Sequence, residues 1–60
     1  MLSFDIGETV LVLIGENKVR GRISRQTSED LIKKGEYFVH TILGTFFVEN
    51  EYIFKSYETI

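Results

Sequence analysis

His40 is the only histidine in the chain and the only side chain that we consider as a general base. If Gly44-Thr45 forms a two-residue hairpin loop, His40 lies opposite Glu49, and a histidine held by a carboxylate is an arrangement that enzymes use. The chain has no cysteine nucleophile, no second histidine and no glycine-rich phosphate loop to complete a catalytic site. We therefore interpret the two residues as a polar cross-strand pair and expect a protein that is not an enzyme.

The composition does not predict metal or cofactor binding. With no cysteine and one histidine, the chain has neither a thiolate site nor a multi-histidine site for a metal. A chain of 60 residues also has little room for a concave pocket that would hold a cofactor or a small-molecule substrate. Because disulfides are excluded, stability must come from burial of the apolar residues, which make up 43% of the chain.

A cluster of basic residues falls in a segment that alternates like a β-strand: Lys18, Arg20, Arg22 and Arg25. Alternation places the first three on one face, where small β-barrels can hold a phosphate backbone. The net charge of −2, from seven basic and nine acidic residues, argues against a non-specific nucleic-acid binder. The alternative is that these charges keep an exposed strand from pairing with other molecules. Nucleic-acid binding through these residues is our second functional hypothesis.

The chain contains more large apolar side chains than a core of this size needs. The expected core consists of Val10, Val12, Ile14, Val19, Ile23, Val39, Leu43, Phe46, Val48 and Ile53. This leaves another group to be covered: Phe38, Ile42, Phe47, Tyr52, Phe54 and Tyr57. An exposed aromatic patch is typical of an interaction surface. The alternative is that these side chains are not exposed. Residues 36–48 are expected to form a hairpin, and Leu31-Ile32 together with the last strand would then cover its second face.

If the patch is exposed, we expect its apolar centre to consist of Phe38, Ile42 and Phe47. Its rim would consist of Tyr52, Glu49 and Glu51. Both another protein and a second copy of the chain, in a homodimer, remain open as partners.

These residues are placed by five expected strands. Two of them cover residues 9–14 and 19–25, two more form the hairpin within residues 36–48, and a short one covers 52–56. Phe4 is expected to cap the core, and Gly21 in mid-strand suggests a bulge or bend. A single helical turn is expected near residues 28–34, with Thr27 as N-cap and Gly35 just after its end.

The hairpin register follows from the expected Gly44-Thr45 loop. It pairs Leu43 with Phe46, Ile42 with Phe47 and Thr41 with Val48, and a three-residue loop would shift this register by one. Tyr37, Val39, Leu43, Phe46 and Val48 would share one face.

Two groups of residues carry a resemblance to a known fold family. The first is FDIGETVLV at residues 4–12, followed by Gly15 and by VRGRI at 19–23; the second is YFV at 37–39, Gly44 and FVENE at 47–51. Together they cover about residues 4–56 and resemble the SH3-like small barrels, including KOW and Tudor-like domains. They are similar to the Tudor-like RNA-polymerase-interacting domain of CarD-type transcription factors and to small phage-encoded SH3-like proteins of unknown role. The chain departs from these patterns in having no proline and no tryptophan, and in having Glu16-Asn17-Lys18 where KOW loops carry a second glycine.

The resemblance implies an all-β fold, a five-stranded SH3-like or Tudor-like barrel with one short helical turn, in a single domain of residues 1–60. It implies a binding module without naming its ligand. Our leading hypothesis is a non-catalytic protein-interaction module, an accessory or inhibitory factor that docks on a larger host complex such as RNA polymerase. Because the N-terminus lacks a basic start and the longest apolar run is Val10 to Ile14, we expect a cytoplasmic protein without membrane contact.

Overall fold

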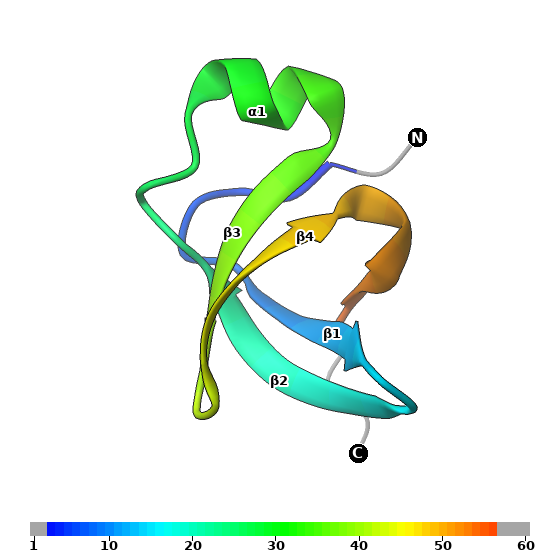
Figure 1. Cartoon of the computed structure of the whole chain (residues 1–60). Coiled ribbons are helices and arrows are strands. Elements are labelled where there is room, and N and C mark those ends of the chain that lie inside the picture. The colour runs from blue at the N-terminus through cyan, green and yellow to red at the C-terminus, as the bar shows by residue number, and fades with distance from the viewer. Residues whose placement is uncertain (1–2, 57–60) are drawn as a thin grey trace.

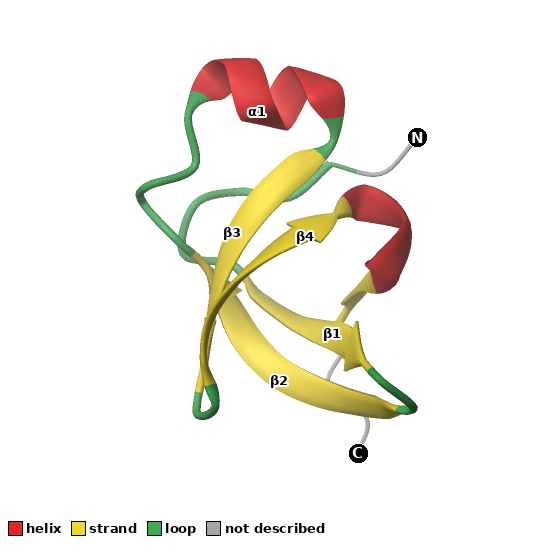
Figure 2. Ribbon diagram, in the orientation of Figure 1, coloured by secondary structure: helices red, strands yellow, loops and turns green. Residues whose placement is uncertain are grey.

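Five antiparallel strands form one sheet in the order β4-β3-β2-β1-β5. The structure is a computed structural model that describes residues 3–56 of the chain. The strands are β1 (Thr9–Ile14), β2 (Asn17–Ile23), β3 (Glu36–Thr41), β4 (Gly44–Glu49) and β5 (Ile53–Lys55). One helix, α1 (Glu29–Lys34), joins β2 to β3, and a 3₁₀ turn, η1 (Asn50–Tyr52), joins β4 to β5 (Figures 1 and 2). The expected all-β class, with five strands and one short helix, is confirmed.

The core lies between two hairpins, because the β3–β4 hairpin lies across the β1–β2 hairpin (Figure 1). Its buried side chains are Phe4, Val10, Val12, Ile23, Tyr37, Val39, Val48 and Ile53, with Ile14, Ile32 and Phe46 packed against them. Phe4 caps the core as expected, and its ring meets that of Tyr37 edge to face at a centroid distance of 5.4 Å. The expectation for Leu43 is wrong, since this side chain is 63% exposed.

Gly21 does not form a bulge, because β2 keeps one continuous register with β1 and β3. The glycine is required for a different reason. A Cβ atom at this position would lie 2.7 Å from both the carbonyl oxygen of His40 and Cγ1 of Val39. The missing side chain therefore lets β3 approach β2 closely, which brings the two hairpins together.

Helix α1 begins one residue later than the capping-box pattern predicts. Ser28, not Thr27, is the N-cap, and its Oγ accepts a hydrogen bond from the Leu31 N–H at 3.2 Å. Gly35 ends the helix in the left-handed region, with φ of 76°, as its position predicts. Thr27 is buried, and its Oγ1 accepts a hydrogen bond from the Phe38 N–H at 3.0 Å.

The turn of the β3–β4 hairpin is centred on Ile42-Leu43, not on Gly44-Thr45. Thr41 and Gly44 are the first paired residues, and the Thr41 hydroxyl group bonds the backbone on both sides of the turn. It accepts from the Leu43 N–H at 3.0 Å and donates to the Gly44 carbonyl oxygen at 2.9 Å. The Thr41 side chain therefore stabilises the turn together with Gly44, which follows it with a φ of 128°. Among the described residues, no helix is long and apolar enough to cross a membrane.

Candidate binding groove along the edge of strand β4

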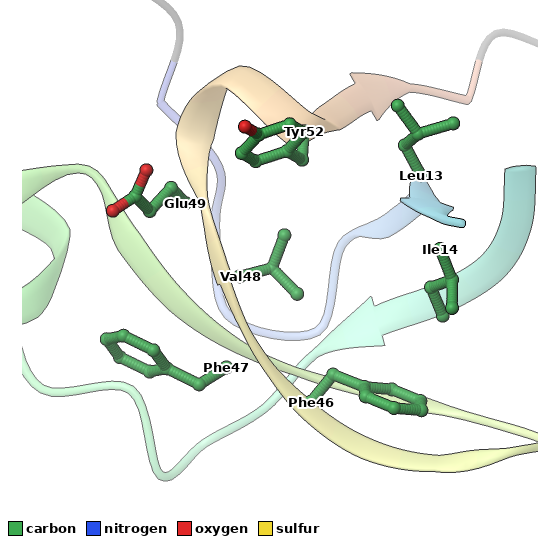
Figure 3. Close-up of a pocket in the computed structure, with 7 residues that line it drawn as sticks. All are labelled: Leu13, Ile14, Phe46, Phe47, Val48, Glu49 and Tyr52. Atoms are coloured by element: carbon green, nitrogen blue, oxygen red, sulfur yellow. The ribbon is translucent and has the colours of Figure 1, made fainter. Parts of the chain in front are cut away.

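An open groove of about 450 Å³ lies between strand β4 and the end of strand β1. Its lining is mostly apolar and consists of Leu13, Ile14, Phe46, Phe47, Val48, Glu49 and Tyr52 (Figure 3). Phe47 is 52% exposed and Tyr52 is 44% exposed, so this part of the surface presents aromatic side chains to the solvent. Exposed aromatic side chains beside a hollow are typical of the centre of an interaction surface.

Strand alternation decides which β4 side chains enter the groove. Phe46 and Val48 point into the groove and toward the core, whereas Phe47 and Glu49 lie on the other side of the strand and line only the margin of the groove (Figure 3). The η1 turn then brings Tyr52 over the opening.

The far wall of the groove exists because β5 is short. Strand β5 pairs only with Val10 to Val12 and begins at Ile53, opposite Val12, whereas β1 continues to Ile14. Leu13 and Ile14 are therefore half-buried and lack a strand neighbour on the β5 side within residues 3–56. From the sequence, residues 9–14 are predicted as a strand and Ile14 as a core residue, and neither Leu13 nor Ile14 is predicted as a site residue.

The predicted aromatic patch is only partly assembled. Phe38 and Phe47 lie opposite each other, with ring centroids 5.2 Å apart, and Tyr52 lines the groove beside Glu49. Ile42 does not join them, because the true register places it at the hairpin turn, where it is 94% exposed. Phe54 is half-buried on β5, and Tyr57 lies outside the described residues.

One end of β4 is acidic. Glu36 and Glu49 are directly opposite each other in the β3–β4 register, and Glu51 follows in the η1 turn. A hollow of about 330 Å³ adjoins them, and its lining consists of Lys34, Gly35, Glu36, Glu49, Asn50 and Glu51. Like charges opposite each other on a sheet repel, so this end of β4 favours a cation.

Lys18, Arg20 and Arg22 are exposed at every second position of β2, as predicted, but they have different surroundings. Arg20 and Arg22 are exposed and line a separate hollow of about 470 Å³ together with His40. Lys18 instead places its Nζ 4.6 Å from the centroid of the Phe54 ring, and Arg25 lies exposed after the end of β2.

His40 does not pair with Glu49. The shifted register places Thr45 opposite His40, and the His40 Nδ1 lies 2.6 Å from the Thr45 Oγ1. The carboxylate that our catalytic arrangement requires is at the other end of the hairpin, so that arrangement is not formed.

Within residues 3–56, no cluster of three or more His, Cys, Asp or Glu side chains has the arrangement of a metal site.

Comparison of the chain with protein-family models, with curated proteins and with solved structures gives no match.

Proposed function

We propose that this chain is a non-catalytic protein-interaction module that binds an apolar segment of a partner protein in the groove along β4. The observation that carries the proposal is the groove itself, with half-exposed Phe47 and Tyr52 at its sides and Leu13 and Ile14 as its far wall. Exposure of such an apolar surface to water is unfavourable in free energy. Large exposed apolar patches therefore usually mark the binding sites of partner proteins.

The sequence resemblance to SH3-like or Tudor-like barrels supports the proposal. The five antiparallel strands and the polar turn before β5 are in keeping with that resemblance. These barrels serve widely as binding modules, and the sequence resemblance extends the proposal to an accessory factor on a larger complex such as RNA polymerase.

A site-specific photo-crosslinker tests the groove. Benzoylphenylalanine placed at Tyr52 should form one defined protein adduct in a lysate of the source cells. The matched control carries the same group at Ile42, which is fully exposed at the other end of the hairpin and should form no such adduct. The substitution Leu13→Glu should abolish the Tyr52 adduct while the variant stays folded, because Leu13 is not in the buried core. The same adduct from both positions, or its persistence with Leu13→Glu, would contradict the proposal.

The second candidate function is nucleic-acid binding, and one specific observation favours it. Arg20, Arg22 and His40 line the same hollow, no carboxylate side chain lines it, and neither arginine has a salt-bridge partner within residues 3–56. This candidate predicts binding to a single-stranded oligonucleotide that weakens steeply with salt. Arg20→Glu together with Arg22→Glu should abolish that binding, whereas Leu13→Glu should leave it unchanged.

A further inference from the structure

We infer that the partner segment binds as an added, antiparallel strand on the free edge of β4, with a lysine or arginine at its N-terminal end beside Glu49. The inference rests on the proposed function and specifies the chemistry of its occupant. It follows from three features of the edge: the direction of the β4 backbone groups, the apolar side chains of the groove, and the charge at the Glu49 end.

Strand β4 is the last strand of the sheet order and has β3 as its only strand neighbour in the described part of the chain. Two hydrogen bonds establish which backbone groups of β4 face outward. The Asn50 N–H donates to the Gly35 carbonyl oxygen at 2.6 Å, so residue 50 directs its amide toward the β3 side. The Phe38 carbonyl oxygen accepts from the Ser24 N–H at 2.7 Å, so residue 38 uses its backbone on the β2 side.

Antiparallel pairs alternate between those that exchange hydrogen bonds and those that do not. Phe38 therefore forms a non-hydrogen-bonded pair with Phe47, and the close approach of their rings fits this. The N–H and C=O groups of Phe47 consequently point away from β3. By the same alternation, so do those of Thr45 and Glu49. The free edge of β4 therefore presents the backbone N–H and C=O groups of Thr45, Phe47 and Glu49, with the spacing that an added strand requires.

The groove lies directly beside these groups and is apolar on the side where an added strand would place every second side chain. Strand residues opposite Phe46 and Val48 would direct their side chains toward Leu13, Ile14 and Tyr52. The end of β1 forms the opposite wall of this space.

The charge at the Glu49 end selects the first residue of the segment. Glu36, Glu49 and Glu51 gather there, and Lys34 is the only basic residue that lines the adjoining hollow in the described chain. A cation opposite Glu49 would relieve the repulsion between Glu36 and Glu49. Because every strand pair in this sheet is antiparallel, the N-terminal residue of the added strand would lie opposite Glu49. The segment thus begins with a basic residue and carries apolar residues at its second and fourth positions.

The probe is an acetylated, amidated hexapeptide of sequence Lys-Val-Thr-Val-Thr-Ser, titrated into the ¹⁵N-labelled full chain and followed by NMR. Without peptide, the amides of Phe47 and Glu49 should exchange with solvent faster than those of Phe46 and Val48. Saturating peptide should slow exchange at Phe47 and Glu49. The matched control, Ser-Val-Thr-Val-Thr-Lys, has the same composition and keeps the valines at the second and fourth positions. It should bind at least about three-fold more weakly because its charge lies at the wrong end.

A backbone variant separates strand addition from binding to the groove alone. The chain is short enough for chemical synthesis, so the Phe47 amide can be N-methylated with its side chain kept. Since that N–H faces outward, the protein should stay folded and should lose at least about five-fold in peptide affinity, as for one hydrogen bond. Unchanged affinity, with groove residues still perturbed by the peptide, would overturn strand addition and leave the proposed function in place. We expect Leu13→Glu to abolish all peptide binding. If the peptide still bound this variant, the result would contradict both strand addition and the proposed function of the groove.

A charge exchange tests the basic residue. Glu49→Lys should weaken binding of the lysine peptide by about three- to five-fold and restore binding to a peptide that begins with glutamate. Equal binding of both peptides to both proteins would overturn the charge assignment. A stable dimer of the free chain that Leu13→Glu dissociates would show a second copy in this position and would overturn the inference.

Discussion

The hydroxyl group of Thr27 takes the place of a strand neighbour for Phe38. It accepts a hydrogen bond from the Phe38 N–H at 3.0 Å and lies 3.4 Å from the Phe38 carbonyl oxygen, to which it donates. Strand β2 ends at Ile23, and the Phe38 carbonyl oxygen still accepts a hydrogen bond from the Ser24 N–H at 2.7 Å. The buried Thr27 hydroxyl group therefore supplies the acceptor for the Phe38 N–H. It thereby keeps the Phe38 backbone turned toward the β2 side, which leaves the Phe47 backbone facing the free edge of β4.

Replacement of Thr27 tests this role. Thr27→Val keeps the shape of the side chain but removes the acceptor for the Phe38 N–H. We expect a loss of about 1–3 kcal/mol in the free energy of unfolding, because a buried donor is left without a partner. Thr27→Ser keeps the hydroxyl group and should cost less than half as much. Urea denaturation measures the free energy of unfolding of both variants. Equal losses would show that Thr27 contributes through packing and not through its hydroxyl group.

Gly21→Ala should be among the most damaging single substitutions in the chain. The new methyl group would lie 2.7 Å from the His40 carbonyl oxygen, which cannot move without shifting β3. Overpacking of this kind costs about 1–3 kcal/mol or more. Gly15→Ala is the matched control: a Cβ there meets open space, and its cost comes only from the positive φ of 63°. Thermal unfolding should give a lower Tm for Gly21→Ala than for Gly15→Ala.

The Glu8 carboxylate makes stability depend on pH. The Asp5 N–H donates to its Oε1 at 2.9 Å, and Lys55 Nζ lies 2.9 Å from its Oε2; together they hold the pKa of Glu8 below its ordinary value of 4.5. A carboxyl group with a lowered folded-state pKa contributes stability above its unfolded-state pKa and loses it as the pH falls through the folded-state value.

Glu8→Gln should therefore be destabilising by at most about 1 kcal/mol at neutral pH, and the difference from the parent chain should shrink below about pH 4.5. Chemical denaturation across pH 3–7 measures this difference. A difference that grows toward acid pH would contradict the assignment. Lys55→Met gives an independent check, because it removes the ion pair and retains the hydrogen bond from Asp5.

The hairpin turn should tolerate polar substitutions. Ile42 is 94% exposed and Leu43 is 63% exposed, so neither contributes much to the core. Ile42→Ser and Leu43→Asn should each change the free energy of unfolding by less than about 0.5 kcal/mol. They should also leave peptide binding in the groove unchanged. Phe46→Ser, on the half-buried face of β4, is the contrasting variant. It should reduce both the free energy of unfolding and peptide binding in the groove. A large loss of stability from Leu43→Asn would restore our first register.

Local sequence patterns were enough to predict strands β1 and β2, because residues 9–14 form an unbroken run of β-branched and aliphatic residues and residues 19–23 alternate with arginines. The sequence also predicted the helix end, since Gly35 meets a local requirement for positive φ. The inward face of the β3–β4 hairpin was predicted correctly at Tyr37 and Val39. These properties depend on neighbours in the chain, and a single sequence contains them.

The hairpin register, and with it the arrangement of the site, depended on packing between distant segments of the chain. Gly44 and Thr41 both offered turn chemistry, and the choice between them depended on packing Phe46 and Val48 against β1 from the far end of the chain. That choice moved Ile42 away from Phe47 and His40 away from Glu49. The groove likewise depends on where β5 begins beside β1, so Leu13 and Ile14 became site residues through a contact between segments about 40 residues apart. Long-range pairing of this kind is absent from local sequence patterns, which is why the residues of the groove could not be read from the chain alone.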